Sequence, residues 1–327
     1  KAVHPNVKMI EVKISQGAKP GLGGLLPAEK NTPEIAKIRG LIPNKMVHSP
    51  PAHKEFSNAE GLLHFVRKLR ILSGGKPVGF KICFGSRQEF ISICEAMVST
   101  GILPDFITVE GGEGGTGAAP IEFSDNVGMP LNDALIFVVD TLNGYGLRKE
   151  LKLIASGKVL SGFDIMRTMC VGADGCNAAR SMLFAIGCIQ ALRCDTNNCP
   201  TGITTQREDL QKGLVVEDKA QRVKNYHEET VSSAMSLLTA AGLDKLEDLN
   251  RSYVYKRVDE YHAYPLSHIF PDVEYGSYLK DEEAYEAKGE SRRHNKEGQE
   301  ERKKKVDPQK ETNTYPRTDM SKKENLP

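Results

Sequence analysis

Short apolar segments alternate with longer segments of helical periodicity up to about residue 205. Six short runs have the apolar or alternating character of strands, and they lie at 9–15, 45–49, 78–84, 106–110, 152–155 and, more weakly, 172–176. Between these runs, apolar residues recur every three or four positions, which is the spacing of a buried helix face. The pattern predicts helices at 57–73, 86–100, 132–147, 164–170 and 178–193.

Two of the predicted helices carry sequence signals at their ends. Ser57 and Ser86 are each followed three residues later by a glutamate, which is the spacing of a capping box. Gly74 and Gly101 follow the last apolar positions, where a left-handed residue commonly ends a helix. We therefore expect the two serines to cap these helices.

Repeated β–α units indicate a parallel sheet with helices packed outside it. Six consecutive units without a reversal favour a (β/α)8 TIM barrel over an open sheet, and a full barrel takes roughly 250 residues. Only about 205 residues are available here, and the chain begins with Lys1 instead of Met. We therefore expect residues 1–205 to form a partial barrel of about six units, with the first two units preceding this sequence.

Two further regions follow the predicted barrel. Residues 206–279 contain a long helical pattern at 218–241 that ends at Gly242, and we expect a helical extension packed on the barrel. Residues 280–327 hold 25 charged residues, 13 basic and 12 acidic, and few apolar ones. Such a composition cannot offset the entropy cost of ordering the chain, so a disordered charged tail is predicted.

Composition and charge narrow the class of protein. The 44 basic and 43 acidic residues give a net charge of +1, without the basic excess typical of nucleic-acid-binding proteins. No apolar run approaches the roughly 18 residues of a membrane-spanning helix. Seven cysteines favour a reducing compartment over a secreted disulfide framework. We expect a cytoplasmic protein that binds no nucleic acid, and membrane anchoring through a preceding segment stays open.

Small residues follow four of the predicted strands. They lie in the segments 16–24, 110–117, 156–157 and 177–180. Functional groups of a barrel enzyme project from the carboxyl ends of the strands, and glycines let backbone amides approach a flat or phosphorylated ligand. The last two segments match the usual phosphate site of a barrel. Each segment alone is compatible with simple turn chemistry, but four at corresponding strand ends predict a ligand site.

Lys81 lies inside the apolar run Val78–Phe84. A strand lysine often extends to a surface. In a closed barrel both faces of a strand are covered, so its ammonium group must meet a ligand or a partner charge. A cation beside the pyrimidine ring of a flavin would stabilise the anionic reduced form. We therefore favour a ligand-binding role for Lys81.

Three cysteines, Cys188, Cys194 and Cys199, lie within 12 residues, and Pro200 follows the last. Closely spaced thiolates can hold an iron–sulfur cluster, and a proline recurs after the last ligand in such runs. Three thiolates suit a [3Fe-4S] cluster, whereas zinc needs a fourth ligand or an open water position. Ordinary buried cysteines explain the pattern as well, so the spacing alone leaves both interpretations open.

Together these segments resemble the flavin domain of the glutamate synthases, and more closely the stand-alone flavoproteins of that family. The resemblance rests on QGAKPGLGG at 16–24, Lys81, GGEGGTGAAP at 111–120 and the cysteine run that ends in CPTG, over roughly residues 8–207. It implies a (β/α)8 barrel that binds FMN and a [3Fe-4S] cluster. It also implies that electrons pass from the cluster to FMN, which reduces 2-iminoglutarate, formed from 2-oxoglutarate and ammonia, to L-glutamate.

The same resemblance assigns roles to individual residues. Gln16, Lys19 and Arg39 would bind the oxo-acid, because a dicarboxylate suits lysine and arginine. Gln16, Lys19 and Lys81 would take part in catalysis. The residues that would contact FMN are Ser49, Lys81, Gly111, Gly112, Gly157, Ala178, Ala179 and Arg180. The cluster ligands would be Cys188, Cys194 and Cys199.

The sequence departs from the family pattern at three of these loops, and one of them is the segment 176–180, which stands in place of a glycine-rich turn. Leu22 and Leu25 replace side chains that are commonly polar in the substrate loop, and Ser156-Gly157-Lys158 replaces an Asp-Gly-Gly turn. Two alternatives therefore stay open, a flavin oxidoreductase acting on another oxo- or hydroxy-acid and a non-catalytic electron-transfer subunit.

The chain carries no convincing dinucleotide fingerprint. We therefore expect a separate electron donor, either a ferredoxin or an NAD(P)H reductase subunit. The other expected partner is a small-molecule substrate, and the sequence is compatible with a homo-oligomer.

Overall fold

The computed structural model describes residues 4–114 and 117–280. The described residues up to Leu279 belong to one compact unit. The predicted charged tail at 280–327, apart from Lys280, lies outside the described residues.

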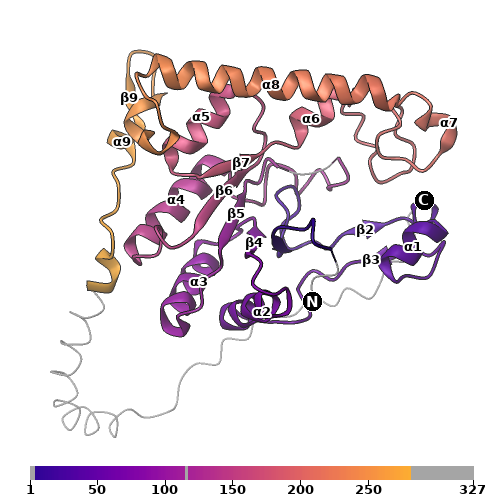
Figure 1. The fold of residues 1–327 in the computed structure, drawn as a ribbon, viewed down its shortest axis with the longest axis horizontal. Helices are drawn as coiled ribbons and strands as arrows, with labels where there is room; N and C mark the ends of the chain where they lie inside the picture. The colour runs from indigo at the N-terminus through magenta and orange to yellow at the C-terminus, as the bar shows by residue number, and fades with distance from the viewer. Residues whose placement is uncertain (1–3, 115–116, 281–327) are drawn as a thin grey trace, which may run out of the picture. The chain divides into compact units, whose positions relative to one another are not determined.

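A five-stranded parallel sheet forms the centre of this unit (Figure 1). Its strands, in spatial order, are β1 (Ile10–Lys13), β4 (Val78–Ile82), β5 (Phe106–Glu110), β6 (Lys152–Ser156) and β7 (Gly175–Asn177). All neighbours are parallel, so the carboxyl ends of the strands lie at one edge. Among the described residues, β1 and β7 each pair on one side only, so the sheet is open. The predicted α/β class with a parallel sheet is confirmed.

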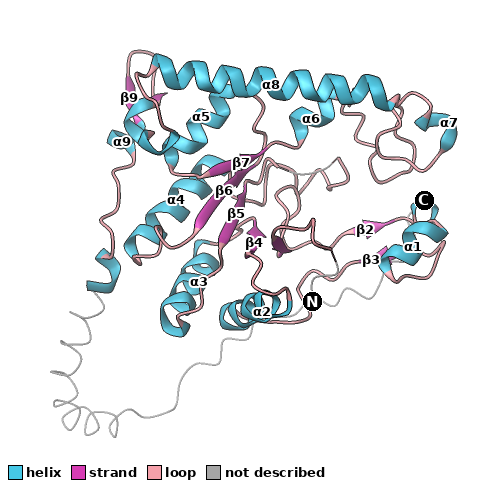
Figure 2. Cartoon of the chain, in the orientation of Figure 1, coloured by secondary structure: helices cyan, strands magenta, loops and turns pink. Residues whose placement is uncertain are grey.

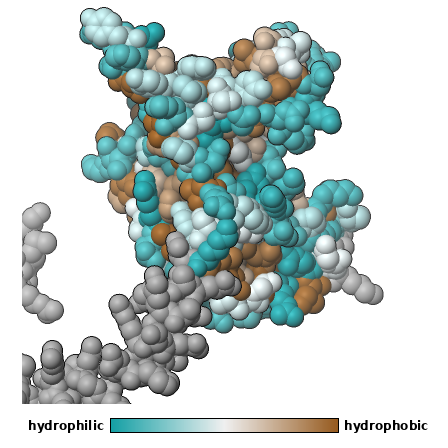
Figure 3. Space-filling model, turned by 90° about the vertical axis from the view of Figure 1, so that its left-hand side faces the viewer, coloured by the Kyte–Doolittle hydropathy of each residue, from teal (hydrophilic) through white to brown (hydrophobic). Residues whose placement is uncertain are grey.

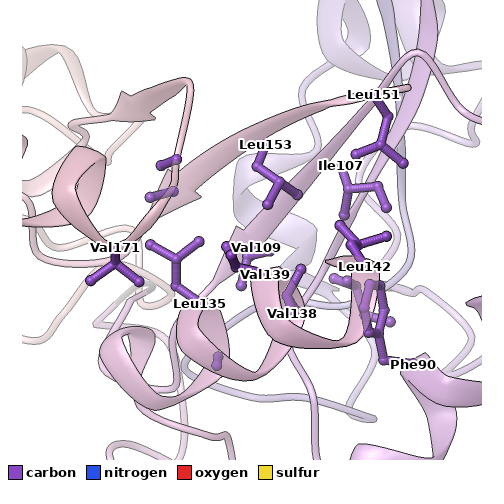
Figure 4. Packing of buried hydrophobic residues seen from close by; sticks show 14 of the residues in the cluster. Phe90, Ile107, Val109, Leu135, Val138, Val139, Leu142, Leu151, Leu153 and Val171 are labelled. Atoms are coloured by element: carbon purple, nitrogen blue, oxygen red, sulfur yellow. The ribbon is translucent and has the colours of Figure 1, made fainter. Parts of the chain in front are cut away.

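Helices that follow the strands cover one face of the sheet (Figure 2). They are α2 (Ala59–Leu72), α3 (Arg87–Thr100), α4 (Leu131–Gly144) and α5 (Gly162–Val171). Leu135, Val138 and Leu142 of α4 belong to one core cluster with Ile107 and Val109 of β5 (Figure 4). These five side chains are fully buried, and burial of each contributes about 1.5–3 kcal/mol. This apolar layer holds the helices on the sheet and leaves the opposite face to polar side chains.

The helix starts agree in part with the predicted capping residues. Ser86 caps α3 and accepts a hydrogen bond from the amide of Gln88. At α2 the cap is Asn58, whose side chain accepts a hydrogen bond from the amide of Gly61. The expectation that Ser57 caps α2 is therefore wrong. Asparagine and serine cap helices about equally well, so the glutamate spacing did not distinguish the two neighbours.

The predicted strand at 45–49 is not part of the parallel sheet. Only β3 (Val47–His48) forms there, and it pairs antiparallel with β2 (Leu25–Leu26). A strand of a covered parallel sheet needs a nearly continuous apolar run. Lys45, His48 and Ser49 are polar and exposed instead. The described sheet therefore has five parallel strands, and the expectation of six is wrong.

The predicted helix at 178–193 is much shorter than expected. Only α6 (Arg180–Ala185) forms. Gly187, Gln190 and Leu192 adopt positive φ angles of 103°, 54° and 54°, and such left-handed residues cannot continue a right-handed helix. Cys188 therefore lies in the loop after α6, and its predicted place late in a helix is wrong.

The long helix α8 (Val216–Ala240) confirms the pattern at 218–241 and packs along α5 and α6 (Figure 1). The helices approach closely at Gly162, where an added Cβ would lie 2.5 Å from the amide nitrogen of Ala234. Ala234 and Leu238 are buried there. The remaining short elements are η1 (Ala28–Lys30), α1 (Pro33–Arg39), α7 (Glu208–Gln211), η2 (Leu246–Asp248), η3 (Arg251–Tyr253), β8 (Tyr255–Arg257), β9 (Ala263–Pro265) and α9 (Leu266–Ile269).

Apolar surface on the face drawn in Figure 3 is divided into small areas among hydrophilic side chains. Within residues 4–114 and 117–280, no helix combines the length and the apolar character needed to cross a lipid bilayer.

Candidate functional site

A cavity of about 500 Å³ lies against the polar side of the sheet. All five strands contribute to it, since it is lined by Glu11, Lys13, Lys81, Glu110, Ser156 and Asn177. The loops that follow the strands complete the lining with Gln16, Glu113, Gly114, Gly157, Lys158, Ala179 and Arg180. We call this space the strand cavity. Charged side chains from neighbouring parallel strands meet here because alternate residues of each strand point away from the helices.

Lys81 forms an ion pair with Glu110 at the centre of the strand cavity. Its ammonium group also donates a hydrogen bond to the carbonyl oxygen of Ser15 at 3.1 Å. The Lys81 side chain is 14% exposed and the Glu110 side chain 9% exposed. The expectation that Lys81 meets a partner charge or a ligand is confirmed for the partner charge.

Lys13 holds Gln16 beside this pair. The Lys13 ammonium group donates a hydrogen bond to the side-chain oxygen of Gln16 at 2.9 Å. Burial is the main cause that lowers the pKa of Lys13, and the positive charges of Lys81 and Lys19 lower it further, against the opposing effect of Glu110. The charges of Lys81, Lys19 and Glu110 therefore all act on the ammonium group of Lys13.

The glycine-rich loop after β5 has two different parts. Gly114 lines the strand cavity, and a Cβ there would lie 3.2 Å from the α-carbon of Gly157. Gly111 and Gly112 are buried and pack away from the cavity lining, since added Cβ atoms would collide with the start of α4 and with Gly128. Both carboxylate oxygens of Glu113 accept a hydrogen bond from the backbone amide of Leu131. This side chain therefore stabilises the first residue of α4.

The structure brings together five of the candidate residues. These are Gln16, Lys81, Gly157, Ala179 and Arg180, and all of them line the strand cavity. Besides Gly111 and Gly112, four candidates for the flavin and substrate sites lie outside its lining. Lys19 is buried and donates to the carbonyl oxygen of Gly23 at 3.4 Å, and Arg39 is exposed at the end of α1. Ser49 is exposed and its amide donates to the carbonyl oxygen of Gly24, while Ala178 packs against the core.

The three cysteines of the sequence run line one small cavity. Cys188, Cys194 and Cys199 share a space of about 100 Å³, which we call the cysteine cavity. It lies beside the loop after β5, because a Cβ added to Gly117 would be 3.1 Å from the sulfur of Cys194. The side chain of Lys30 fastens the loop from outside by donating to the carbonyl oxygen of Cys194 at 2.7 Å.

The pKa of the Cys199 thiol is lowered from its ordinary value. Burial raises its pKa, but hydrogen bonds from the Thr201 hydroxyl and the Thr204 backbone amide outweigh burial and lower the pKa to about 6. Thiolates, not thiols, bind iron and zinc. By contrast, burial raises the pKa of Cys83 to about 12 and that of Cys170 to about 11.

The cysteine cavity offers three thiol groups, and thiolates can bind iron. Among the described residues, no three cysteine, histidine or acidic side chains converge on one point as ligands of a single metal ion do. In an iron–sulfur cluster each thiolate binds a different iron atom, so the cysteines need only line a common space.

Arg180 lines both the strand cavity and the cysteine cavity. It is the first residue of α6, and the loop that carries the cysteines begins at the other end of that short helix. The two cavities are therefore neighbours across one side chain.

Two residues of the strand cavity were missed by sequence reasoning. Glu110 is the last residue of a predicted strand and the first of a glycine-rich segment, and Lys13 lies in the predicted strand at 9–15. The signal was available, because each is a charged residue at or near the end of an apolar strand, as Lys81 is.

Comparison with known proteins places the chain in a family. A family model described as "Conserved region in glutamate synthase" matches residues 2–244. "Glutamate synthase large subunit-like protein YerD" from Bacillus subtilis (strain 168) is 42% identical over 254 residues, which are 78% of this chain and 48% of that protein. "Archaeal glutamate synthase (NADPH)" from Methanocaldococcus jannaschii is 38% identical over 241 residues, covering 73% and 46% of the two chains.

The chain thus spans about half the length of these curated relatives. A mutant flavocytochrome b2 with pyruvate bound superimposes with a TM-score of 0.42 at 14% identity, covering 75% of this chain and 47% of that chain. This structural likeness is too distant to carry an argument. The family model, by contrast, covers well over half of the chain, and the chain therefore belongs to the family of the conserved region of glutamate synthase.

Proposed function

We propose that the chain is the flavin- and cluster-binding part of a glutamate-synthase-like oxidoreductase. In this proposal it reduces 2-iminoglutarate, formed from 2-oxoglutarate and ammonia, to L-glutamate. The observation that carries the proposal is that Arg180 lines both the strand cavity and the cysteine cavity. Redox groups bound in these neighbouring cavities would exchange electrons over a short distance.

The open sheet would be part of a (β/α)8 barrel. Glu11 and Lys13 support this, because they lie on the face of β1 opposite to its core residue Val12 and line the strand cavity. In a barrel such residues face the interior and the catalytic groups follow the strands. The proposed organisation is a partial barrel at 1–205, a helical extension at 206–279 and a charged tail at 280–327.

The strand cavity suits FMN in size, charge and backbone shape. Its volume falls within the roughly 300–1,000 Å³ of typical cofactor sites. Gly114 and Gly157 present backbone without side chains, and backbone of this kind can approach a ligand closely. Lys81 would contact the flavin ring. Ser49, Gly111 and Gly112 would shape the ring pocket only after a shift of their segments, because the lining of the strand cavity does not include them. Gly157, Ala179 and Arg180 would surround the phosphate, and Ala178, which packs against the core, would support them from behind.

When bound, FMN would supply the hydride that the imine carbon receives. The chain's own residues would hold the substrate and exclude water. Gln16 already has its side-chain oxygen fixed by Lys13, which leaves its amide nitrogen to donate to a substrate carboxylate. Lys19 and Arg39 would bind the carboxylates of 2-oxoglutarate, and this would require the segment 16–24 and α1 to adjust, since neither side chain lines the cavity.

The cysteine cavity would hold a [3Fe-4S] cluster through Cys188, Cys194 and Cys199. The lowered pKa of Cys199 supports this role, because the thiolate is then present at neutral pH. The cluster would receive electrons from a separate donor, a ferredoxin or an NAD(P)H-dependent reductase. The name of the relative from Methanocaldococcus jannaschii specifies NADPH.

A second candidate function is the reduction or oxidation of a less polar oxo- or hydroxy-acid. Leu22 and Leu25 favour it, because both are more than 40% exposed in the segment proposed to bind substrate. Exposed apolar side chains there would suit a substrate with one carboxylate.

Flavin reoxidation separates these proposals. The chain is loaded with FMN, iron and sulfide, reduced without oxygen, and mixed with 2-oxoglutarate plus ammonium in a stopped-flow instrument. Rapid return of the oxidised flavin spectrum with formation of L-glutamate supports the first proposal. Reoxidation only by monocarboxylic oxo-acids supports the second, and no reoxidation by any of them points to a non-catalytic electron-transfer subunit.

A further inference from the structure

Glu110 is the most buried carboxylate of the strand cavity, with only 7% of the residue exposed. It is the last residue of β5, and its main chain is paired with Ser156 of β6. A buried carboxylate is costly unless charges and hydrogen bonds compensate it. The contacts of this side chain therefore indicate its role.

The two oxygens of this carboxylate bind different partners. Oε2 pairs with the ammonium group of Lys81 on β4, and Oε1 accepts the backbone amide of Gly17 at 3.0 Å. Gly17 belongs to the loop after β1 that carries Gln16 and Lys19. One side chain thus joins the lysine of β4 to the loop after β1.

The backbone around Gly17 is packed closely against the loop after β5. A Cβ on Gly17 would lie 2.7 Å from the carbonyl oxygen of Gly114 and closer still to that of Gly111. The loops after β1 and β5 are therefore in direct backbone contact. Glu110 lies at this contact and accepts a hydrogen bond from the Gly17 amide.

The other charged groups near Glu110 have different partners or the opposite sign. Glu11 accepts the hydroxyl of Thr108 at 2.6 Å, and Glu113 accepts the amide of Leu131. Lys13 and Lys19 are cations that act on the same cluster. Glu110 is thus the carboxylate in contact with Lys81.

We propose that Glu110 is a positioning residue that fixes the Lys81 ammonium group and the loop of Gln16 and Lys19, and that offsets the positive charge beside the flavin. The effect on the flavin rests on the proposed function, whereas the positioning of Lys81 and of the loop does not. A lone lysine beside the ring would favour the anionic reduced flavin, whereas the Lys81–Glu110 pair carries no net charge. Glu110 would therefore keep the reduction potential lower than Lys81 alone would set it.

The contact with the loop is tested without any cofactor. Hydrogen–deuterium exchange of the peptide that covers residues 15–19 is measured for the wild-type chain, Glu110→Gln and Glu110→Leu. Glutamine retains an oxygen for the Gly17 amide, whereas leucine does not. We expect faster exchange in Glu110→Leu and nearly unchanged exchange in Glu110→Gln. Equal exchange in all three chains would overturn the positioning role.

The charge effect is tested by the flavin midpoint potential at neutral pH, where free lysine is protonated and free glutamate is ionised. Relative to wild type, Glu110→Gln adds one positive charge, Lys81→Met removes one, and the double variant does neither. We expect a more positive potential in Glu110→Gln, a more negative one in Lys81→Met, and a near wild-type value in the double variant. Glu11→Gln is the matched control, and its shift should be smaller because Glu11 does not contact Lys81.

A Glu110→Gln potential at or below the wild-type value, or loss of FMN from this variant alone, would overturn the charge effect. If the wild-type chain itself binds no FMN, the proposed function fails, and hydrogen exchange still decides the positioning of the loop.

Discussion

The substitution Gly17→Ala tests the packing of the strand cavity most sharply. The new methyl group would press on the carbonyl oxygens of Gly111 and Gly114, and both belong to backbone that cannot turn away as a flexible side chain can. Overpacking of this kind costs about 1–3 kcal/mol. Displacing the Gly17 amide from Glu110 would also remove a hydrogen bond to a buried charge, which is worth about 1.5–3 kcal/mol. We expect a loss of about 2.5–6 kcal/mol in the free energy of unfolding.

Gly85→Ala is the matched control, because no heavy atom lies within 4 Å of its added Cβ. It should leave stability unchanged or raise it by about 0.4–1 kcal/mol, since alanine restricts the unfolded chain. The free energy of unfolding is measured by urea titration followed by far-ultraviolet circular dichroism. If Gly17→Ala were as stable as Gly85→Ala, the close contact between the loops after β1 and β5 would be refuted.

Three further predictions concern the cysteines and the helix layer. Cys194→Ser should abolish the low-temperature EPR signal of the cluster, and Cys94→Ser should retain it, because Cys94 lies in the apolar core; an unchanged signal in Cys194→Ser would remove that residue from the ligand set. Arg251→Met should destabilise the chain by about 3–5 kcal/mol in urea titration, because it leaves the Asp140 carboxylate without its buried partner; a loss below about 1 kcal/mol would contradict the strength of this pair. Iodoacetamide at neutral pH should label Cys83 only after unfolding, because burial and the charge of Glu110 raise its pKa to about 12; rapid labelling of the folded chain, followed by mass spectrometry, would contradict its burial.

The fold was predictable where burial alone decides structure. The run Val78–Ile82 is apolar apart from Lys81 and forms a central strand, as the sequence indicates. The segment 178–193 is also largely apolar, but its helix ends at Ala185, and positive φ angles at Gly187, Gln190 and Leu192 keep the following residues from continuing it. The hydropathy pattern indicates which residues are buried, but it does not predict which residues adopt a left-handed backbone conformation. The prediction for the segment 45–49 was wrong for a related reason. A short alternating run can pair with any neighbouring strand, and here it pairs with β2 and not with the parallel sheet.

The candidate site was predictable in its chemistry more than in its geometry. Lys81 was expected to meet a charge, and it does. That charge, Glu110, is 29 positions away in the sequence, and only the pairing of β4 with β5 brings the two together. The place of Arg180 between two cavities also depends on how the loop after α6 folds back. Contacts of this kind follow from strand order, which residue spacing does not contain.

The measurement that tests the central claim most directly is low-temperature EPR of the chain loaded with FMN, iron and sulfide, with flavin and iron quantified. The account predicts a [3Fe-4S] signal in the oxidised state and a single FMN per chain. It also predicts a flavin radical whose relaxation is accelerated by the neighbouring cluster. A flavin radical that relaxes as it would without a cluster, in a chain that holds both cofactors, would contradict the claim that the strand cavity and the cysteine cavity hold them side by side.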